Sequence, residues 1–102
     1  MAYLRIWKFR PPTGREEEFA AAYSPDGDWA RLFSIADGFI ETQLLRPAQP
    51  GGWWMTVDRW RSEQAFEAFE AERGDDYRRL DAELEGCAGE EVFVGAFEDL
   101  SS

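Results

Sequence analysis

Trp53-Trp54-Met55-Thr56-Val57-Asp58-Arg59-Trp60 runs directly into Arg61-Ser62-Glu63-Gln64-Ala65-Phe66, and this stretch decides the fold. The first eight residues are rich in aromatic and β-branched types, which predicts a strand. Ser62 can cap a helix that begins after it, and Glu63 adds a negative charge in the first turn, where the helix dipole favours one. The sequence therefore predicts a strand that passes straight into a helix.

The two faces of this strand can be separated by parity, because successive side chains point to opposite faces of a sheet. One face carries Trp54, Thr56, Asp58 and Trp60, and the other carries Trp53, Met55, Val57 and Arg59. Both faces hold large apolar groups. The chain's own helices can cover only one of them, so we expect the second to be covered by a second copy in a homodimer packed sheet to sheet.

The rest of the chain supplies the partners of this strand. Strands are predicted over residues 3–9, 39–46 and 91–97, the last with Val92 and Val94 alternating with Phe93 and Phe97, and residues 47–52 form a turn. A capping box of Thr13 and Glu16 predicts a first helix, and Asp28 can cap a short second helix. This second helix is expected to end at Asp37-Gly38, because Gly38 tolerates a left-handed backbone. The segment after Ser62 is either one long helix kinked at Gly74, a possible hinge, or two collinear pieces. The order predicts a single α+β domain over 1–102: a ferredoxin-like βαββαβ fold with an antiparallel sheet and its helices on one face.

Composition excludes several classes of partner. The formal net charge is -10, with 21 acidic and 11 basic residues, so phosphate backbones and anionic lipid surfaces would be repelled. We expect no nucleic-acid or membrane partner, and no apolar run is long enough to span a bilayer. The single cysteine, Cys87, rules out an internal disulfide and fits a reducing compartment, so a cytoplasmic location is expected.

The chain lacks the residues that many catalytic sites need. It contains no His and no Asn, so neither Ser-His-Asp nor Cys-His constellations can be assembled. With one Cys and no His, zinc sites lose their usual ligands. Asp26-Gly27-Asp28 lacks the ligand spacing of a calcium loop, and the glycines match no phosphate-binding fingerprint. The sequence thus predicts neither a metal nor a cofactor.

What remains is a cavity lined by aromatic rings with a few ionisable groups. Asp58 lies between Trp54 and Trp60 on its strand, where desolvation would raise its pKa and make it a general base near neutral pH. Alternatively, Asp58 pairs with Arg5 or Arg46 on a neighbouring strand. The two Trp rings can likewise be read as ordinary core.

The same stretch resembles a known family. Trp60-Arg61-Ser62-Glu63-Gln64-Ala65-Phe66 is similar to the strand-to-helix signature of the antibiotic biosynthesis monooxygenase superfamily, whose members are dimeric α+β barrels. Asp37-Gly38-Phe39-Ile40 with Leu44-Leu45-Arg46 resembles that family's glycine-led second strand. The resemblance extends through Leu80. Tyr23-Ser24-Pro25-Asp26-Gly27-Asp28-Trp29 further resembles one branch of the family, for which no reaction is known to us.

The resemblance implies a pocket between sheet and helices. In quinone-forming members a pocket Trp would fall at Trp60, an Asn at Thr56 and a Tyr at Phe66, so two of three polar functions are replaced here. Those enzymes use no cofactor, because the deprotonated substrate itself reduces oxygen. In haem-degrading relatives the axial His would fall near Arg79, and this chain has none; Tyr77 could in principle ligate iron.

Two functional hypotheses follow. The first is a cofactor-independent monooxygenase, or a related isomerase, acting on a small aromatic or polyketide-like molecule, with Trp60, Asp58 and Tyr77 as catalytic residues. Trp54, Trp60, Phe66 and Phe69 would sandwich the ring, and Arg79 would hold a developing enolate. The predicted substrate-binding residues are Tyr23, Trp29, Phe33, Trp54, Thr56, Phe66, Phe69 and Arg79. The second hypothesis is a catalytically inactive dimeric protein with a binding or structural role.

Overall fold

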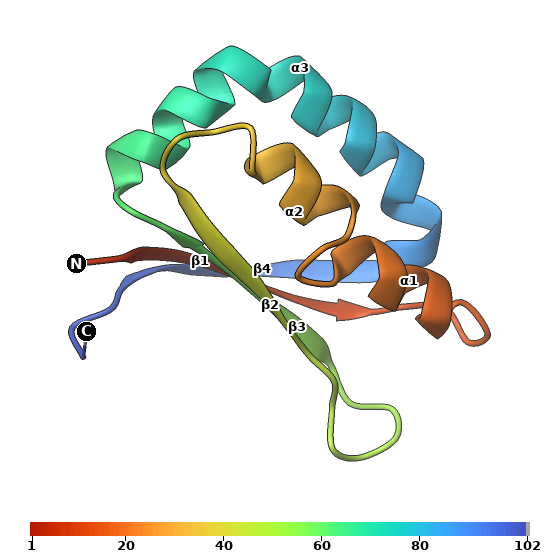
Figure 1. The fold of residues 1–102 in the computed structure, drawn as a ribbon. Helices are drawn as coiled ribbons and strands as arrows, with labels where there is room; N and C mark the ends of the chain where they lie inside the picture. Colours follow the sequence, from red (N-terminus) through yellow and green to blue (C-terminus); the bar gives the residue numbers. More distant parts are fainter. Residues whose placement is uncertain (102) are drawn as a thin grey trace.

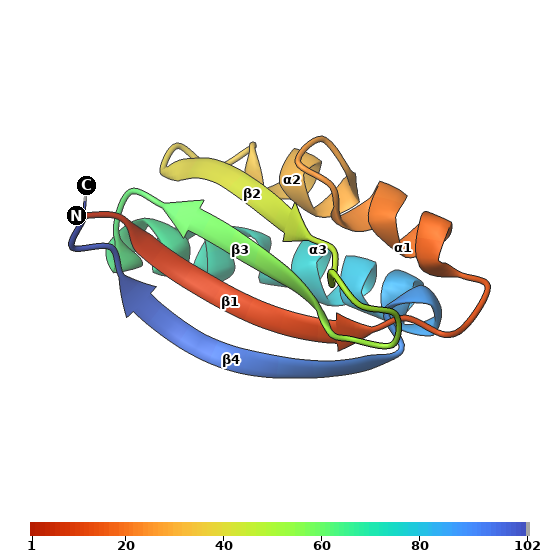
Figure 2. The ribbon, with the colours of Figure 1, turned by 90° about the horizontal axis from the view of Figure 1, so that it is seen from below.

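A computed structural model describes residues 1–101, which follow the predicted order of strands and helices. The elements are β1 (Tyr3–Arg10), α1 (Glu16–Tyr23), α2 (Asp28–Phe33), β2 (Phe39–Leu45), β3 (Trp54–Trp60), α3 (Glu63–Ala88) and β4 (Glu90–Glu98). The strands form one antiparallel sheet in the order β2-β3-β1-β4. All three helices lie on one face of that sheet, and the chain leaves the other face uncovered (Figures 1 and 2). This is the predicted α+β ferredoxin-like fold.

The predicted parity of β3 is confirmed. Residues at even positions are buried and those at odd positions are partly exposed, in strict alternation from Trp54 to Trp60. The even positions therefore face the helices. On β1 the register pairs Tyr3 with Trp60 and Phe9 with Trp54, so the odd positions of β1 share that covered face.

Strand β4 departs from the simple alternation predicted for it. The register with β1 shifts between Ile6 and Trp7, which leaves Val94 as an extra residue. A bulge of this kind reverses the side-chain parity beyond it. Phe93 lies opposite Trp7 and Phe97 lies opposite Leu4, so the two rings are on opposite faces and not on one. A sequence pattern of period two cannot reveal the extra residue.

The predicted helix starts are right in one case and wrong in two. Ser62 caps α3, where its hydroxyl accepts a hydrogen bond from the Ala65 amide at 3.1 Å. For α1 the N-cap is Arg15 and no side chain caps it; Glu16 instead accepts from the Gly14 amide at 2.7 Å. The N-cap of α2 is Gly27, and Asp28 is the first helical residue.

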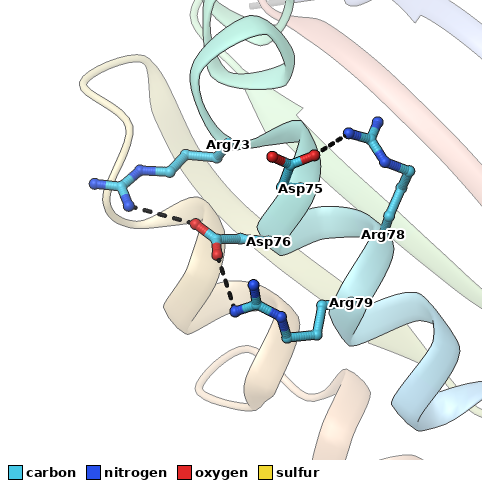
Figure 3. Close-up of polar contacts among 5 residues, drawn as sticks. All are labelled: Arg73, Asp75, Asp76, Arg78 and Arg79. Atoms are coloured by element: carbon cyan, nitrogen blue, oxygen red, sulfur yellow. Dashed lines mark hydrogen bonds and ion pairs between the residues drawn. The ribbon is translucent and has the colours of Figure 1, made fainter.

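Helix α3 runs from Glu63 to Ala88 with a kink that joins two helical pieces. The kink falls at Arg73, where φ is -120° and ψ is 20°, and not at the predicted Gly74. Ion pairs gather just after this point, joining Asp75 to Arg78, and Asp76 to both Arg73 and Arg79 at 3.4 and 3.5 Å (Figure 3). These side chains are largely exposed, so the pairs add little stability. Within residues 1–101, no helix combines the length and the apolar character needed to cross a bilayer.

Trp60 is the centre of the core at one end of the sheet. Its side chain is completely buried, and the rings of Phe33, Phe39, Phe66 and Phe69 surround it with centroids at 5.3–5.4 Å. Aromatic pairs at such distances each add to the stability that burial already provides. This cluster ties α2 and α3 to β2 and β3.

Gly38 lets the start of α3 approach the start of β2. A Cβ atom on Gly38 would lie 2.2 Å from the Cβ of Ala65. Its φ is not positive, so the left-handed backbone expected at this residue is not what requires glycine. The requirement is the close approach of the two segments.

We predict that Gly38→Ala lowers the free energy of unfolding by about 1–3 kcal/mol, because the added methyl overpacks a tight contact. The measurement is urea denaturation. Gly86→Ala is the matched control: there the new methyl would meet only the flexible end of Arg15, at 2.9 Å, and alanine is the better helix former. Equal stability of Gly38→Ala and the wild type would contradict this account of Gly38.

Candidate functional site

A cavity lies between the covered face of the sheet and the three helices, as the family resemblance implied. Its aromatic walls come from β1, α1, α2 and α3, and are formed by Trp7, Phe9, Tyr23, Trp29, Phe33 and Tyr77. Its polar groups come from all the remaining elements and from α3, and are Thr42, Thr56, Asp58, Asp81 and Glu91. The predicted combination of rings and a few ionisable groups is therefore present.

The cavity is narrow. Its volume is about 30 Å³, which is room for only a small number of water molecules. Pockets that enclose drug-sized ligands are roughly tenfold larger or more. An aromatic ligand therefore enters only if lining side chains or a covering helix move.

Asp58 carries the most perturbed carboxylate of the site. It comes from the buried row of β3, and its Oδ1 accepts a hydrogen bond from the Thr42 hydroxyl on β2 at 2.8 Å. Burial raises the pKa of Asp58 to about 6, against the opposing effects of the Thr42 hydrogen bond and the Arg5 charge. A carboxylate with this pKa is ionised at neutral pH and is basic enough to accept a proton.

The alternative in which Asp58 pairs with Arg5 or Arg46 is wrong. Among residues 1–101, neither arginine forms an ion pair with it. Arg5 lies opposite Asp58 across the β1–β3 pair, but its guanidinium is held by aromatic rings instead. Arg46 lies over the Trp54 ring, 5.4 Å from its centroid. The hydrogen-bond partner of Asp58 is a neutral hydroxyl, and the Arg5 charge acts on Asp58 without an ion pair.

Tyr77 faces the cavity from α3, with its ring centroid 4.9 Å from that of Trp29. Burial raises the pKa of Tyr77 to about 12, and burial also raises the pKa of Tyr23. Both phenols are thus protonated at neutral pH. Tyr77 is suited to donate a hydrogen bond, and Asp58 is the group suited to accept a proton.

Two further acids line the cavity, Asp81 on α3 and Glu91 on β4. Burial, followed by the negative charges of Asp81 and Glu85, raises the pKa of Glu91. None of the described lining residues is Lys or Arg. The electrostatics of the cavity therefore disfavour an anionic ligand and favour a neutral or cationic one.

Six of the predicted site residues are brought together. Asp58 and Tyr77 line the cavity, and so do Tyr23, Trp29, Phe33 and Thr56. The structure thus assembles both candidates for proton transfer with four of the eight predicted contact residues. Their roles in binding and catalysis stay predictions.

Five predicted residues lie outside the cavity. Trp60, Phe66 and Phe69 are buried in the core, where each ring packs against other rings. Trp54 packs edge-on against Phe19 at 5.4 Å near the other end of the sheet. Arg79 is 70% exposed, pairs with Asp76 and is not among the lining residues of the cavity (Figure 3).

Sequence reasoning missed five lining residues: Trp7, Phe9, Thr42, Asp81 and Glu91. Asp81 follows Tyr77 by four positions, which places both on one helix face and was a usable signal. Thr42, by contrast, reaches Asp58 only through the β2–β3 register, which shifts between Phe39 and Glu41. That register cannot be read from the sequence.

The residues present do not fit haem, which some members of the resembled family degrade. The chain has no His, and burial raises the pKa of both cavity phenols, Tyr23 and Tyr77, that of Tyr77 to about 12, which opposes the ionised form that iron would need. The cavity of about 30 Å³ has no room for a macrocycle. Within residues 1–101, no cluster of acidic or thiol ligands suited to a metal ion is found.

Solved structures share the fold across nearly the whole chain. SnoaB, a cofactor-independent oxygenase from Streptomyces nogalater, has a TM-score of 0.70 at 18% identity, with 99% of this chain and 95% of that chain covered. A putative antibiotic biosynthesis monooxygenase from Bacillus cereus has a TM-score of 0.69 at 16% identity, with 100% and 94% covered. The heme-degrader MhuD from Mycobacterium tuberculosis has a TM-score of 0.67 at 22% identity, with 98% of this chain and 97% of that chain covered.

These identities show a shared fold and do not transfer an activity. No curated protein sequence matches the chain. The model of one family, antibiotic biosynthesis monooxygenase, matches residues 2–80, which include α1, α2, the first three strands and most of the cavity wall. The chain therefore belongs to the antibiotic biosynthesis monooxygenase family.

Proposed function

We propose that the protein is a cofactor-independent monooxygenase that oxidises a small, neutral aromatic molecule. The observation that carries this proposal is Asp58, a carboxylate buried on β3 in a ring-lined cavity, with its pKa raised by burial to about 6. A base of this strength, shielded from water, is what a reaction that starts by removing a proton from carbon requires. Membership of the monooxygenase family supports the same reading.

The chemistry can be written with oxygen as the only co-reactant. The Asp58 carboxylate removes a proton from an acidic methylene group of the ring system, and the resulting carbanion reduces dioxygen by one electron. The two radicals combine into a peroxide anion, which takes the proton back from Asp58, and loss of water from the resulting hydroperoxide leaves a carbonyl. In the net change, one methylene group and one dioxygen molecule become one carbonyl group and one water molecule. The Tyr77 phenol would stabilise the carbanion by donating a hydrogen bond to an adjacent oxygen of the substrate. A related isomerase would return the proton from Asp58 to another carbon.

The narrowness of the cavity favours a second candidate, a dimeric binding or structural protein that has lost the chemistry. A volume of about 30 Å³ leaves no room for an aromatic substrate until the protein moves. If the walls stay closed, Asp58 is a buried group without a reaction partner. The two candidates differ in whether an aromatic ligand enters at all, and in whether oxygen is consumed when it does.

We also propose a homodimer built on the uncovered face of the sheet. The apolar residues of that face follow from the strand registers and include Leu4, Ile6, Leu45, Val57, Val92 and Phe97. Leu45, Val92 and Phe97 remain 40–49% exposed. An apolar face formed by four adjacent strands is stabilised by removal from water, and a second copy offers a matching surface. A cytoplasmic location remains a prediction from the single cysteine.

With an anthrone-type substrate in oxygenated buffer, we predict enzyme-dependent oxygen uptake, and a loss of at least about a hundredfold in its rate for Asp58→Asn. The amide keeps an acceptor for Thr42 but cannot take up a proton, and general bases contribute at least this factor. Glu83→Gln, which neutralises an exposed acid on α3, is the matched control and should leave the rate unchanged.

The two candidates separate on the same samples. Absence of oxygen uptake, together with retention of an aromatic ligand by the wild type, would reject the monooxygenase and support the binding protein. If Asp58→Asn consumes oxygen as fast as the wild type, the protein is still a monooxygenase, but Asp58 is not its base.

For the dimer, light scattering at micromolar concentration should give a mass of twice the chain mass of 11.7 kDa. Val57→Lys places a charge in the middle of the apolar face and should shift the mass toward that of one chain. Ile35→Lys, at an exposed apolar residue away from the sheet, is the control and should remain dimeric. A monomeric wild type would contradict the proposal.

A further inference from the structure

Arg5 is the one cation that β1 directs toward the helices. It lies on the covered face with Tyr3, Trp7 and Phe9, directly opposite Asp58 in the antiparallel β1–β3 pair. Side chains opposite one another on the same face of such a pair start about 5 Å apart at their Cβ atoms. The backbone therefore places Arg5 next to the proposed base.

The Arg5 guanidinium packs against two aromatic rings and makes no ion pair or hydrogen bond with Asp58. Its central carbon lies 4.2 Å from the ring centroid of Phe66 on α3 and 4.6 Å from that of Phe93 on β4. Its Nη1 donates a long hydrogen bond, 3.4 Å, to the Tyr3 hydroxyl. Within residues 1–101 it forms no ion pair. Cation–π contacts with these two rings favour this position of the charge.

This position has an electrostatic consequence for the cavity. The other titratable groups that face Asp58 are Tyr23 on α1, Tyr77 and Asp81 on α3, and Glu91 on β4, and none of them is a cation. Arg5 is therefore the positive charge that opposes desolvation. It lowers the pKa of Asp58 and also that of Tyr77, although burial outweighs it at both.

The packing of Arg5 against the two rings also disfavours a direct contact that would disable the base. An arginine free to swing could form a bidentate pair with Asp58, occupying the oxygens that must accept the proton. Held by Phe66 and Phe93, the Arg5 charge acts on Asp58 through space. The second carboxylate oxygen of Asp58, Oδ2, accepts no hydrogen bond from any side chain among residues 1–101. The attraction then favours the ionised carboxylate, in opposition to the effect of burial.

We propose that Arg5 is a positioning residue for the reaction: packed against Phe66 and Phe93, it favours the ionised form of Asp58 at the cavity wall without pairing with its oxygens. The inference rests on the proposed function for its catalytic meaning, but the coupling between the two residues is a property of the folded protein alone. It can be tested without any substrate.

The test is a double-mutant cycle on the unfolding equilibrium, with wild type, Arg5→Met, Asp58→Asn and the double variant. Methionine keeps an unbranched apolar stem that packs on aromatic rings but carries no charge. At about pH 8, where Asp58 is ionised, we expect Arg5→Met to raise the unfolding constant about tenfold more in the wild-type background than in the Asp58→Asn background. At about pH 5 the carboxylate is mostly protonated in the folded state, and the difference should disappear.

Lysine at position 5 provides the charge control. Arg5→Lys loses the planar contact with the rings and is expected to be less stable, but it should retain coupling to Asp58 at about pH 8. If Arg5→Met does not fold, Arg5→Gln replaces it in the same cycle. An equal effect of removing the Arg5 charge in both backgrounds at about pH 8 would overturn the inference, because packing alone would then explain Arg5.

The pH dependence of oxygen uptake provides a second test of the same coupling. Loss of the Arg5 charge raises the pKa of Asp58, so the acid limb of the oxygen-uptake profile should move up by about one pH unit in Arg5→Met. Absence of oxygen uptake in every variant would reject the proposed function and leave the cycle as the test of the coupling. Coupling absent from the cycle while uptake persists would reject the inference and leave the proposed function.

Discussion

Only one face of the four-stranded sheet is covered by the chain's own helices, and the rest of the structure depends on this constraint. Because successive residues of β3 alternate between faces, the covered face receives Trp54, Thr56, Asp58 and Trp60 as a fixed set. A strand that sends a Trp to each end of the buried row must also send its middle residues there. The carboxylate of Asp58 is thus carried into an aromatic interior by the geometry of the strand.

The buried row of β3 contributes to the packed core at one end and to the cavity in its middle. At the Trp60 end four rings close around one indole and no space remains, so the contact between Gly38 and Ala65 can draw α3 tightly against the sheet. In the middle, the short side chains of Thr56 and Thr42 leave a gap beneath Trp29 and Tyr77. The rigid end can hold the strand in place while the middle adapts, which is the arrangement that an opening cavity would need.

The sequence predicted the features that depend on local pattern. The alternation of β3 and the Ser62 cap follow from period and residue type, and both are confirmed. Two local predictions failed, the caps at Thr13 and Asp28, because Arg15 and Gly27 occupy the cap positions. The parity of β4 failed because it depends on pairing with residues distant in sequence. The extra residue Val94 reverses the side-chain parity of β4, and no feature of the local sequence predicts this.

The candidate site was predicted in part for the same reason. Asp58, Tyr77, Tyr23, Trp29, Phe33 and Thr56 were placed by parity, helix period and family resemblance, and they do meet. Phe66 and Phe69 share a helix with Tyr77 and have the same aromatic character, yet they fill the core because the first turns of α3 lie over Trp60. Which rings border a space and which fill one is decided by packing in three dimensions, and the sequence carries no local signal of it.

The most direct measurement is the titration of Asp58 in the folded protein, followed by carbon-13 NMR of the side-chain carboxyls, with Asp58→Asn to identify its signal. The account predicts a midpoint near pH 6, because burial raises the pKa of this carboxyl to about 6. A midpoint close to the value of about 3.9 for an unperturbed aspartate would contradict it. Asp58 would then be an ordinary solvated acid, and the cavity would have no base.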